Sequence, residues 1–251
     1  QLFVKINNNK YKTGISPATL PPALKPMSTI GSLKTELLKN AINDISNFAD
    51  TKETIDIKTI ITLQGFKAHN LIKLSAANGN MGAISIIPNL DTINDFTLTL
   101  LNSSIKALIP KLESENVTLQ TDGDMLTIID GNVMYTIRLT GVKPVALEEI
   151  VKIKPNTIGI TVNTSELDEA LRLIINTVGN TGVSFKVDIN GFCDIQTQST
   201  KTTIHTTLGT AITEPILFAI DPKKLKKALN TIYDDTVTIY ASNEDTSPIW
   251  I

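Results

Sequence analysis

The stretch Thr97-Leu-Thr-Leu-Leu-Asn-Ser-Ser-Ile-Lys-Ala-Leu-Ile-Pro-Lys111 places a strand-like run directly before an amphipathic helix. Three more strand-like runs follow at 117–121, 125–129 and 133–139, and Asp122-Gly123 and Asp130-Gly131 between them supply the positive φ of tight hairpins. The apolar face of the helix consists of Ile105, Leu108, Ile109 and Leu112. This stretch therefore predicts one strand–helix–hairpin unit.

The same order of elements recurs along the chain. A strand and a helix are predicted at 158–162 with 166–177, and again at 216–220 with 222–231. A first helix is also followed by predicted strands at 57–63, 71–76 and 83–87, and the remaining strands are expected at 183–189, 192–197, 202–208 and 237–240. Four copies of one unit indicate a long-period repeat, with two units in each domain. The expected fold is α+β, with helices on one face of antiparallel sheets.

The helices are defined by their apolar faces and by candidate N-caps. The predicted faces are Leu33, Leu37, Ala41, Ile45 and Phe48 in the first helix, Leu167, Leu171, Ile174 and Val178 in the third, and Leu225, Leu229 and Ile232 in the fourth. The candidate caps are Ser32, Asn102 or Ser103, Thr164 or Ser165, and Asp221.

The amino-acid composition excludes several classes of protein. The chain has 251 residues, of which 41% are hydrophobic and 19% are charged, so an extended disordered protein is excluded. A net charge of −2 means that any nucleic-acid surface must come from local clusters of cations. One cysteine, Cys193, excludes an internal disulfide. No signal peptide or membrane span is recognisable, so we expect a cytoplasmic protein without a membrane partner.

The chain offers no pattern typical of catalysis. Its two histidines, His69 and His205, stand apart from other residues at metal-ligand spacing. Asp122, Asp124 and Asp130 fall in hairpin turns, where aspartate is expected. A glycine-rich phosphate loop is also missing. We therefore predict a protein that is not an enzyme and that uses no cofactor or metal.

Cations lie on the helix faces opposite or beside the apolar stripes. Surface helices often carry lysine, and Glu36 and Glu169 share these faces, but the run Lys223-Lys-Leu-Lys-Lys227 stands out in an otherwise acidic chain. The cations are Lys39, Lys106, Lys111, Arg172, Lys223 and Lys227.

Several strings resemble the β subunit of bacterial DNA polymerase III, the beta sliding clamp. They are Phe218-Ala-Ile-Asp-Pro-Lys-Lys-Leu-Lys-Lys-Ala-Leu-Asn230, Val237–Tyr240 followed by Thr246–Ile251, the paired hairpins of 118–139, and the Gly141–Pro144 segment. The resemblance covers about residues 10–251. It implies a DNA-clamp fold with sheets outside and helices lining one face, so that the helix cations face duplex DNA.

The resemblance also implies a division of the chain and a mechanical function. Residues 28–153 would form the middle clamp domain and 154–251 the C-terminal one, while 1–27 would be the end of a missing first domain plus the crossover. The full protein would be a homodimer ring that encircles double-stranded DNA without sequence preference. Short peptide motifs would attach DNA polymerase and clamp-loader subunits to it.

The peptide groove of the family lies between the middle and last domains, beside a turn that reads roughly T-D-G-H-R-L. The matching stretch here is Ala77-Asn-Gly-Asn-Met-Gly82, which keeps Gly79 but replaces the His, Arg and Leu. The family's P-M-R-L tail, which completes the groove, has no counterpart before Ile251. The expected groove residues are Leu63, Ala77, Gly79, Met81, Gly82, Pro144 and Ile150.

Three other interpretations stay open at the level of the sequence. A genuine two-domain clamp would close as a trimer. The scarcity of aromatic residues, 5% of the chain, also suits a β-rich structural or surface module. The third alternative is an enzyme without a recognisable motif.

Overall fold

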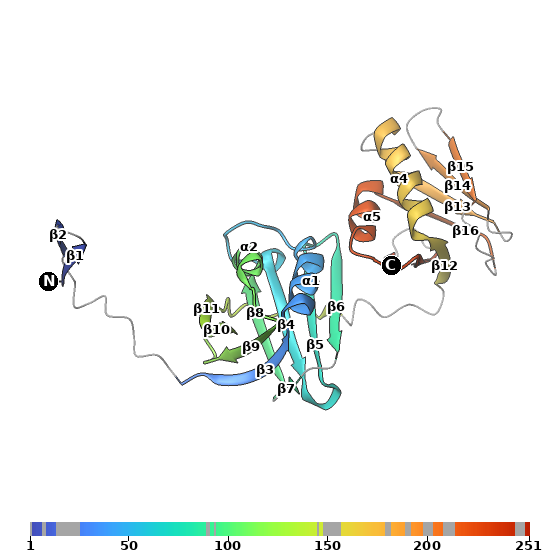
Figure 1. Cartoon of the computed structure of the whole chain (residues 1–251). Helices are drawn as coiled ribbons and strands as arrows, with labels where there is room; N and C mark the ends of the chain where they lie inside the picture. Colours follow the sequence, from blue (N-terminus) through green and yellow to red (C-terminus); the bar gives the residue numbers. More distant parts are fainter. Residues whose placement is uncertain are drawn as a thin grey trace.

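The computed structural model of the chain describes residues 2–6, 9–13, 26–88, 91–92, 94–144, 146–147, 157–178, 182–188, 192–197, 203–207, 214–243 and 249–251. Buried apolar side chains form two separate clusters, one from residues between Ile30 and Ile137 and the other from residues between Ile160 and Ala241. Each cluster belongs to its own unit of sheet and helix (Figure 1).

The first unit combines two antiparallel sheets with helices α1 (Thr35–Ser46) and α2 (Asn102–Leu108). One sheet has the order β11-β10-β9-β3-β7, formed by Val133–Arg138, Met125–Asp130, Asn116–Thr121, Ser28–Lys34 and Asp91–Thr92. The other has the order β6-β5-β4-β8, formed by Gly82–Pro88, Leu71–Ala77, Ile60–Phe66 and Phe96–Leu101. Short 3-10 turns lie at Ile57–Thr59, Lys67–His69 and Ile109–Lys111.

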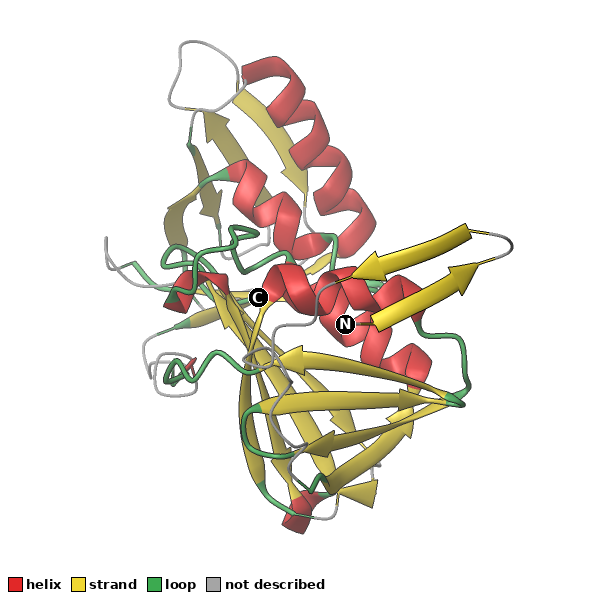
Figure 2. Cartoon of the chain, turned by 90° about the vertical axis from the view of Figure 1, so that its left-hand side faces the viewer, coloured by secondary structure: helices red, strands yellow, loops and turns green. Residues whose placement is uncertain are grey.

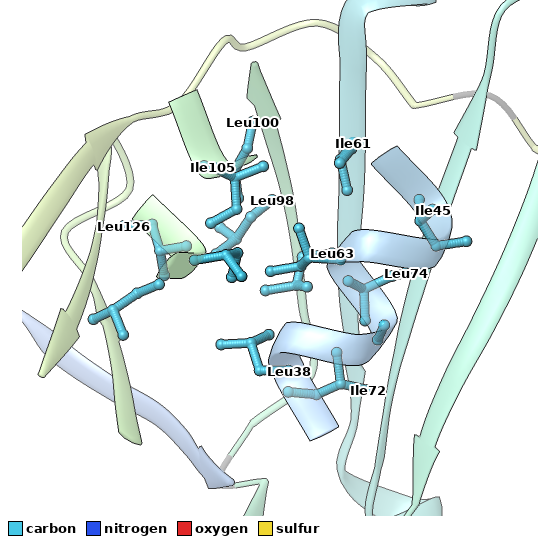
Figure 3. Packing of buried hydrophobic residues seen from close by; sticks show 14 of the residues in the cluster. Leu38, Ile45, Ile61, Leu63, Ile72, Leu74, Leu98, Leu100, Ile105 and Leu126 are labelled. Atoms are coloured by element: carbon cyan, nitrogen blue, oxygen red, sulfur yellow. The ribbon is translucent and has the colours of Figure 1, made fainter. Parts of the chain in front are cut away.

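Helix α1 fills the centre of the first core, and the predicted stripe of this helix was right at Ala41, Ile45 and Phe48 but wrong at Leu37. Its buried side chains include Leu38, Ala41, Ile42 and Ile45. In Figure 3, Leu38 and Ile45 lie near Leu63, Ile72 and Leu74 of the sheet below the helix. Leu37 is 40% exposed instead. The reason is that β3 runs through Lys34, so the helix begins only at Thr35 and Leu33 is a strand residue. Ser32 likewise caps no helix, because its hydroxyl donates to the Val117 carbonyl.

The second unit has α4 (Thr164–Val178) beside α5 (Pro222–Leu229). They cover a sheet of order β15-β14-β13-β16, formed by Thr203–Thr207, Phe192–Thr197, Val183–Val187 and Ile216–Ile220, and the pair β12 (Ile158–Asn163) with β17 (Thr236–Ala241). A separate hairpin joins β1 (Leu2–Ile6) to β2 (Asn9–Thr13) (Figure 2). Of the predicted apolar faces, Leu167, Leu171, Ile174, Leu225 and Leu229 are confirmed as buried. Ile232 is half-buried beyond the end of α5, and the side chain of Val178 lies outside the described part of the structure.

Most predicted strands agree with the structure to within two residues at each end, but one began too early. Residues 57–59 form a 3-10 turn before β4, and Asp56 caps this turn by accepting from the Lys58 amide. The hairpin glycines Gly123 and Gly131 have φ of 91° and 58°, as the turn pattern predicted. The proposed turn at Asn190-Gly191 lies outside the described residues.

The helix caps differ from the prediction at α2 and α4 as well as at α1, and α2 follows Leu101 with no side-chain cap. Asp221 caps α5 as expected, whereas Asn163, not Thr164 or Ser165, accepts from the first amides of α4. Asn102 is fully buried, and its Nδ2 donates to the carbonyls of Ser46, Ala49 and Asp50 at 3.0, 3.2 and 3.3 Å. Asn102 therefore satisfies carbonyls at and beyond the end of α1, which joins the ends of α1 and β8 in the first core.

Asp130 organises the segment between the second helix and β9. Its two carboxylate oxygens each accept a backbone N–H at 2.8 Å, from Glu113 and Ser114. The hydrogen bond from the Ser114 side chain lowers the pKa of Asp130 below its usual 3.8, and the backbone hydrogen bonds and the charge of Lys39 act in the same direction, against burial. The ionised form is thus the one that the fold selects.

We expect Asp130→Ala to lower the free energy of unfolding by about 2 kcal/mol at neutral pH, because two partly buried backbone hydrogen bonds lose their charged acceptor. Since the pKa is lowered on folding, this stabilisation is complete above 3.8 and is lost as the pH falls through the lower, folded-state value. Urea unfolding of both proteins across this range measures the difference. Asp234→Ala, at an exposed position, is the control. A deficit that is the same at every pH would contradict the role of the carboxylate.

Candidate functional site

A groove of about 930 Å³ lies between the two units. The first unit contributes the end of α1, the turn at Ile57–Lys58, the β5–β6 turn and Leu147. The second unit contributes the end of β16, the buried and half-buried positions Lys224, Leu225 and Ala228 of α5, and the segment after this helix. Ile249, Trp250 and Ile251 complete the lining.

The β5–β6 turn holds Met81 against the groove through a set of local hydrogen bonds. The Asn78 side-chain oxygen accepts from the amides of Asn80 and Met81 at 3.2 and 3.1 Å, and the Asn78 amide donates to the Met81 carbonyl at 3.0 Å. Gly79 has φ of 89°, a conformation that strains any residue with a β carbon. The turn is therefore fixed by its own sequence, and Met81 projects from a rigid support.

Gly82 allows the interdomain segment to approach the turn closely. A β carbon at Gly82 would lie 3.0 Å from Cδ2 of Leu147, which is tighter than an ordinary contact. Leu147 is buried and lines the groove at this place. The small residue at 82 thus gives Leu147 its position in the floor of the groove.

The wall around Trp250 is attached to the second unit by the backbone. The Trp250 amide donates to the Tyr240 carbonyl at 2.9 Å, and the Tyr240 amide donates back at 2.8 Å. Ile249 packs against the second core cluster. The half-buried indole of Trp250, the single tryptophan of the chain, is thereby held at the groove by a bridge to β17.

Two contacts connect the units beside the groove. The Tyr233 hydroxyl donates to Oδ1 of Asp44 at 3.1 Å, and Ala228 of α5 packs against the first core cluster. Burial raises the pKa of Asp44 and outweighs the opposing effect of the hydrogen bond from Tyr233. The same hydrogen bond raises the pKa of Tyr233.

The predicted DNA-facing cations differ in exposure and in ion pairing. Lys106, Lys111, Lys223 and Lys227 are exposed, whereas Arg172 is exposed but pairs with Asp168 at 2.8 Å. Asp168 also pairs with Lys226 across the α4–α5 interface. Lys39 is half-buried and does not oppose the buried face of α1, because it stands about 100° from Leu38 around the helix. The outward positions of α1 are Glu36, Asn40 and Asn43.

Comparison with known proteins relates these two units to solved structures. No protein-family model and no curated protein matches the chain. The DNA polymerase III beta subunit of Thermotoga maritima matches 98% of this chain and 68% of its own, with a TM-score of 0.79 and 16% identity. The chain has the sliding-clamp fold.

Two other solved clamps give the same result. The sliding clamp of Bacillus subtilis covers 98% of this chain and 67% of its own with a TM-score of 0.79 and 16% identity. The Helicobacter pylori beta clamp bound to a DNA ligase peptide covers 98% and 69%, with a TM-score of 0.75 and 16% identity. The α+β fold that the strand–helix–hairpin repeat predicted, and the clamp fold that the resemblance implied, are therefore confirmed.

On this clamp fold, the structure brings together part of the predicted groove set. Ala77, Gly79, Met81 and Gly82 line the groove. Leu63 does not, because it faces the helix side of β4 and is 3% exposed in the core (Figure 3). Pro144 is described but lies outside the groove lining, and Ile150 lies outside the described residues.

Sequence reasoning missed several groove residues on the clamp fold. The most important are Leu147, Ile232 and Trp250, which come from three separate segments. The signal that could have indicated Leu147 is the glycine at 82, since a glycine in a strand often marks a close approach of another segment.

Metal binding and membrane insertion find no support in the described part of the clamp fold. No three His, Cys, Asp or Glu side chains gather there as metal ligands would. None of the helices in the described ranges has the length and apolar character needed to cross a bilayer.

Proposed function

We propose that this chain works as a DNA sliding clamp, a non-enzymatic cytoplasmic ring that encircles duplex DNA and holds a polymerase on it. Residues 28–153 and 154–251 would be two of its domains, and the ring would be completed by homo-oligomerisation. The observation that carries the proposal is the groove between two units of clamp fold. A Helicobacter pylori clamp with this fold is bound to a DNA ligase peptide.

The groove has the character of a site for a short peptide. Apolar side chains such as Met81, Leu147, Ile232 and Ile249 form its interior, while charged residues stand among its lining. A pocket of this size accommodates a few side chains and typically gives micromolar affinity. We therefore propose that polymerase and clamp-loader subunits attach here through segments with a glutamine, a leucine and an aromatic residue.

The DNA-facing surface would be formed by the exposed cations of the helices. Lys106 and Lys111 belong to the first unit, and Lys223 and Lys227 to the second. Few phosphate contacts and no reading of bases suit a ring that has to slide, because strong contacts would hold it in place.

Trp250 provides a direct test of peptide binding. A tryptophan-free peptide with the glutamine, leucine and phenylalanine pattern should change the fluorescence of Trp250 in a saturable way, with a Kd of about 1–100 μM. A peptide in which serine replaces the leucine and phenylalanine is the control. Calorimetry on the same pair is the second measurement, and the absence of both a signal and binding heat would overturn the proposed groove function.

A further inference from the structure

The two helices of each unit carry opposite charge. In the first unit, α1 has two acids and one lysine, while α2 and the 3-10 turn after it have two lysines and no acid. In the second unit, α4 has three acids and one arginine, while α5 has four lysines and no acid. One helix of each pair is therefore anionic and its neighbour is cationic.

The charges of α4 are only partly balanced by ion pairs. Asp168 is half-buried and pairs both with Lys226 of α5 and with Arg172, the single cation of α4, at 2.8 Å for the arginine. Glu166 and Glu169 are exposed, and neither has an ion-pair partner among the described residues. The exposed side of α4 therefore presents two uncompensated carboxylates.

The exposed sides of α4 and α5 face the same way. The two helices lie side by side over one sheet (Figure 1), and the Asp168 ion pair connects them. Glu169 lies about 200° around α4 from the buried Leu167. Lys227 lies about 200° around α5 from the buried Leu225, which is the same relation. A polyanion that approaches the exposed lysines of α5 therefore meets the carboxylates of α4 beside them.

We propose that each unit contacts duplex DNA through one helix only, α2 in the first unit and α5 in the second, and that Glu166 and Glu169 repel phosphates and so limit the affinity for DNA. The inference rests on the proposed DNA-clamp function and adds to it the residues that oppose binding. Helix α1 fits the same scheme, because its outward residues are an acid and two asparagines. A ring that slides needs a weak hold on DNA, and like charge beside a contact weakens it.

The test measures binding of a labelled duplex of arbitrary sequence to the full chain by anisotropy. One variant changes Glu166 and Glu169 to Gln, which keeps the size of both side chains and removes their charge, and a second variant changes both to Lys. The matched controls carry the same two pairs of changes at Glu53 and Glu214, which are exposed and lie outside the helices. Unfolding curves establish that all variants are folded.

At low salt we expect the α4 glutamine variant to bind DNA roughly fivefold more tightly than the wild type, because each exposed charge has a modest effect at a hydrated surface. This gain should shrink as salt is added. The α4 lysine variant should bind more tightly still, and its log–log salt slope should steepen by about 1.8, the value for two further phosphate contacts. The glutamine control should stay within about twofold of the wild type, and the lysine control should keep the wild-type slope.

The failure of this inference differs from the failure of the proposed function. If neither the wild type nor the α4 glutamine variant binds DNA, the proposed clamp function is overturned together with the inference. If the wild type binds and the glutamine variant binds equally well, the inference alone is overturned, because DNA then does not pass α4. An equal gain in the controls would also overturn it, since only net charge would matter. Binding by the glutamine variant alone would support it, because the carboxylates would then outweigh the lysines.

Discussion

Replacing Met81 by Asp should lower the affinity for a clamp-binding peptide by about 100-fold, which corresponds to about 3 kcal/mol. The substitution puts a carboxylate into the apolar lining of the groove, where an occupant would strip it of water. The charge cannot turn away easily, since the Asn78 hydrogen bonds fix the backbone of the turn. Trp250 fluorescence and calorimetry both measure the loss.

The matched control for this variant is Ile86→Asp on β6, the strand that follows the turn of Met81. Ile86 is 60% exposed and does not line the groove, so it adds the same charge to β6 without touching the site. We expect peptide affinity within about twofold of the wild type, because isolated surface changes have small effects. If Met81→Asp binds as well as the wild type, the peptide does not occupy this groove.

Reversing four charges, with Lys106, Lys111, Lys223 and Lys227 all changed to Glu, should abolish association with duplex DNA at low salt. If these lysines contact four phosphates, binding to the wild-type chain depends on salt with a log–log slope of about −3.6. In the variant, each of the four glutamates would repel the phosphate that the lysine had contacted. Anisotropy of a labelled duplex of arbitrary sequence, measured over a range of salt concentrations, gives both the affinity and the slope.

A second quadruple variant shows whether a loss of DNA binding comes from the helix lysines themselves or only from the change in net charge. Lys52, Lys67, Lys143 and Lys186 are exposed and lie outside the proposed surface, so their change to Glu alters the overall charge equally. This variant should keep most of its binding. Equal loss in the two variants would mean that only total charge matters, and unchanged binding in the first would mean that these helices do not face DNA.

Prediction from sequence succeeded where the start of a helix is marked by a cap, and it failed where the start of a helix or the orientation of a buried strand is not marked in the sequence. In α4 and α5 the predicted Leu167, Leu171, Ile174, Leu225 and Leu229 are buried, and α5 starts with its Asp221 cap. Helix α1 follows β3 without an intervening turn, so no punctuation marks the change and Leu33 was assigned to the wrong element. The spacing of apolar residues indicates a strand or a helix, but it does not show the residue at which the strand ends and the helix begins.

Only part of the groove could be predicted from the sequence. The turn at 77–82 could be located because its residues are contiguous and Gly79 needs its unusual φ. Leu63 belongs to a strand that is buried along most of its length, and such a strand gives no sign of which side faces a groove. Leu147 and Trp250 reach the site only through tertiary structure, so no local pattern contains them.

The separation of the two core clusters has a mechanical consequence for a ring built from such units. Each unit has its own close-packed core, and in the described ranges the contacts between the units include Ala228, the Tyr233–Asp44 hydrogen bond and the lining of the groove. Bending is therefore concentrated at this joint. A bound peptide that contacts both walls would stabilise one arrangement of the two units. Because this coupling is reciprocal, a force that moves the walls apart would lower the affinity for the peptide. In such a ring, flexing and occupancy of the groove would thus be opposed, so a ring with an occupied groove would be stiffer than one with an empty groove.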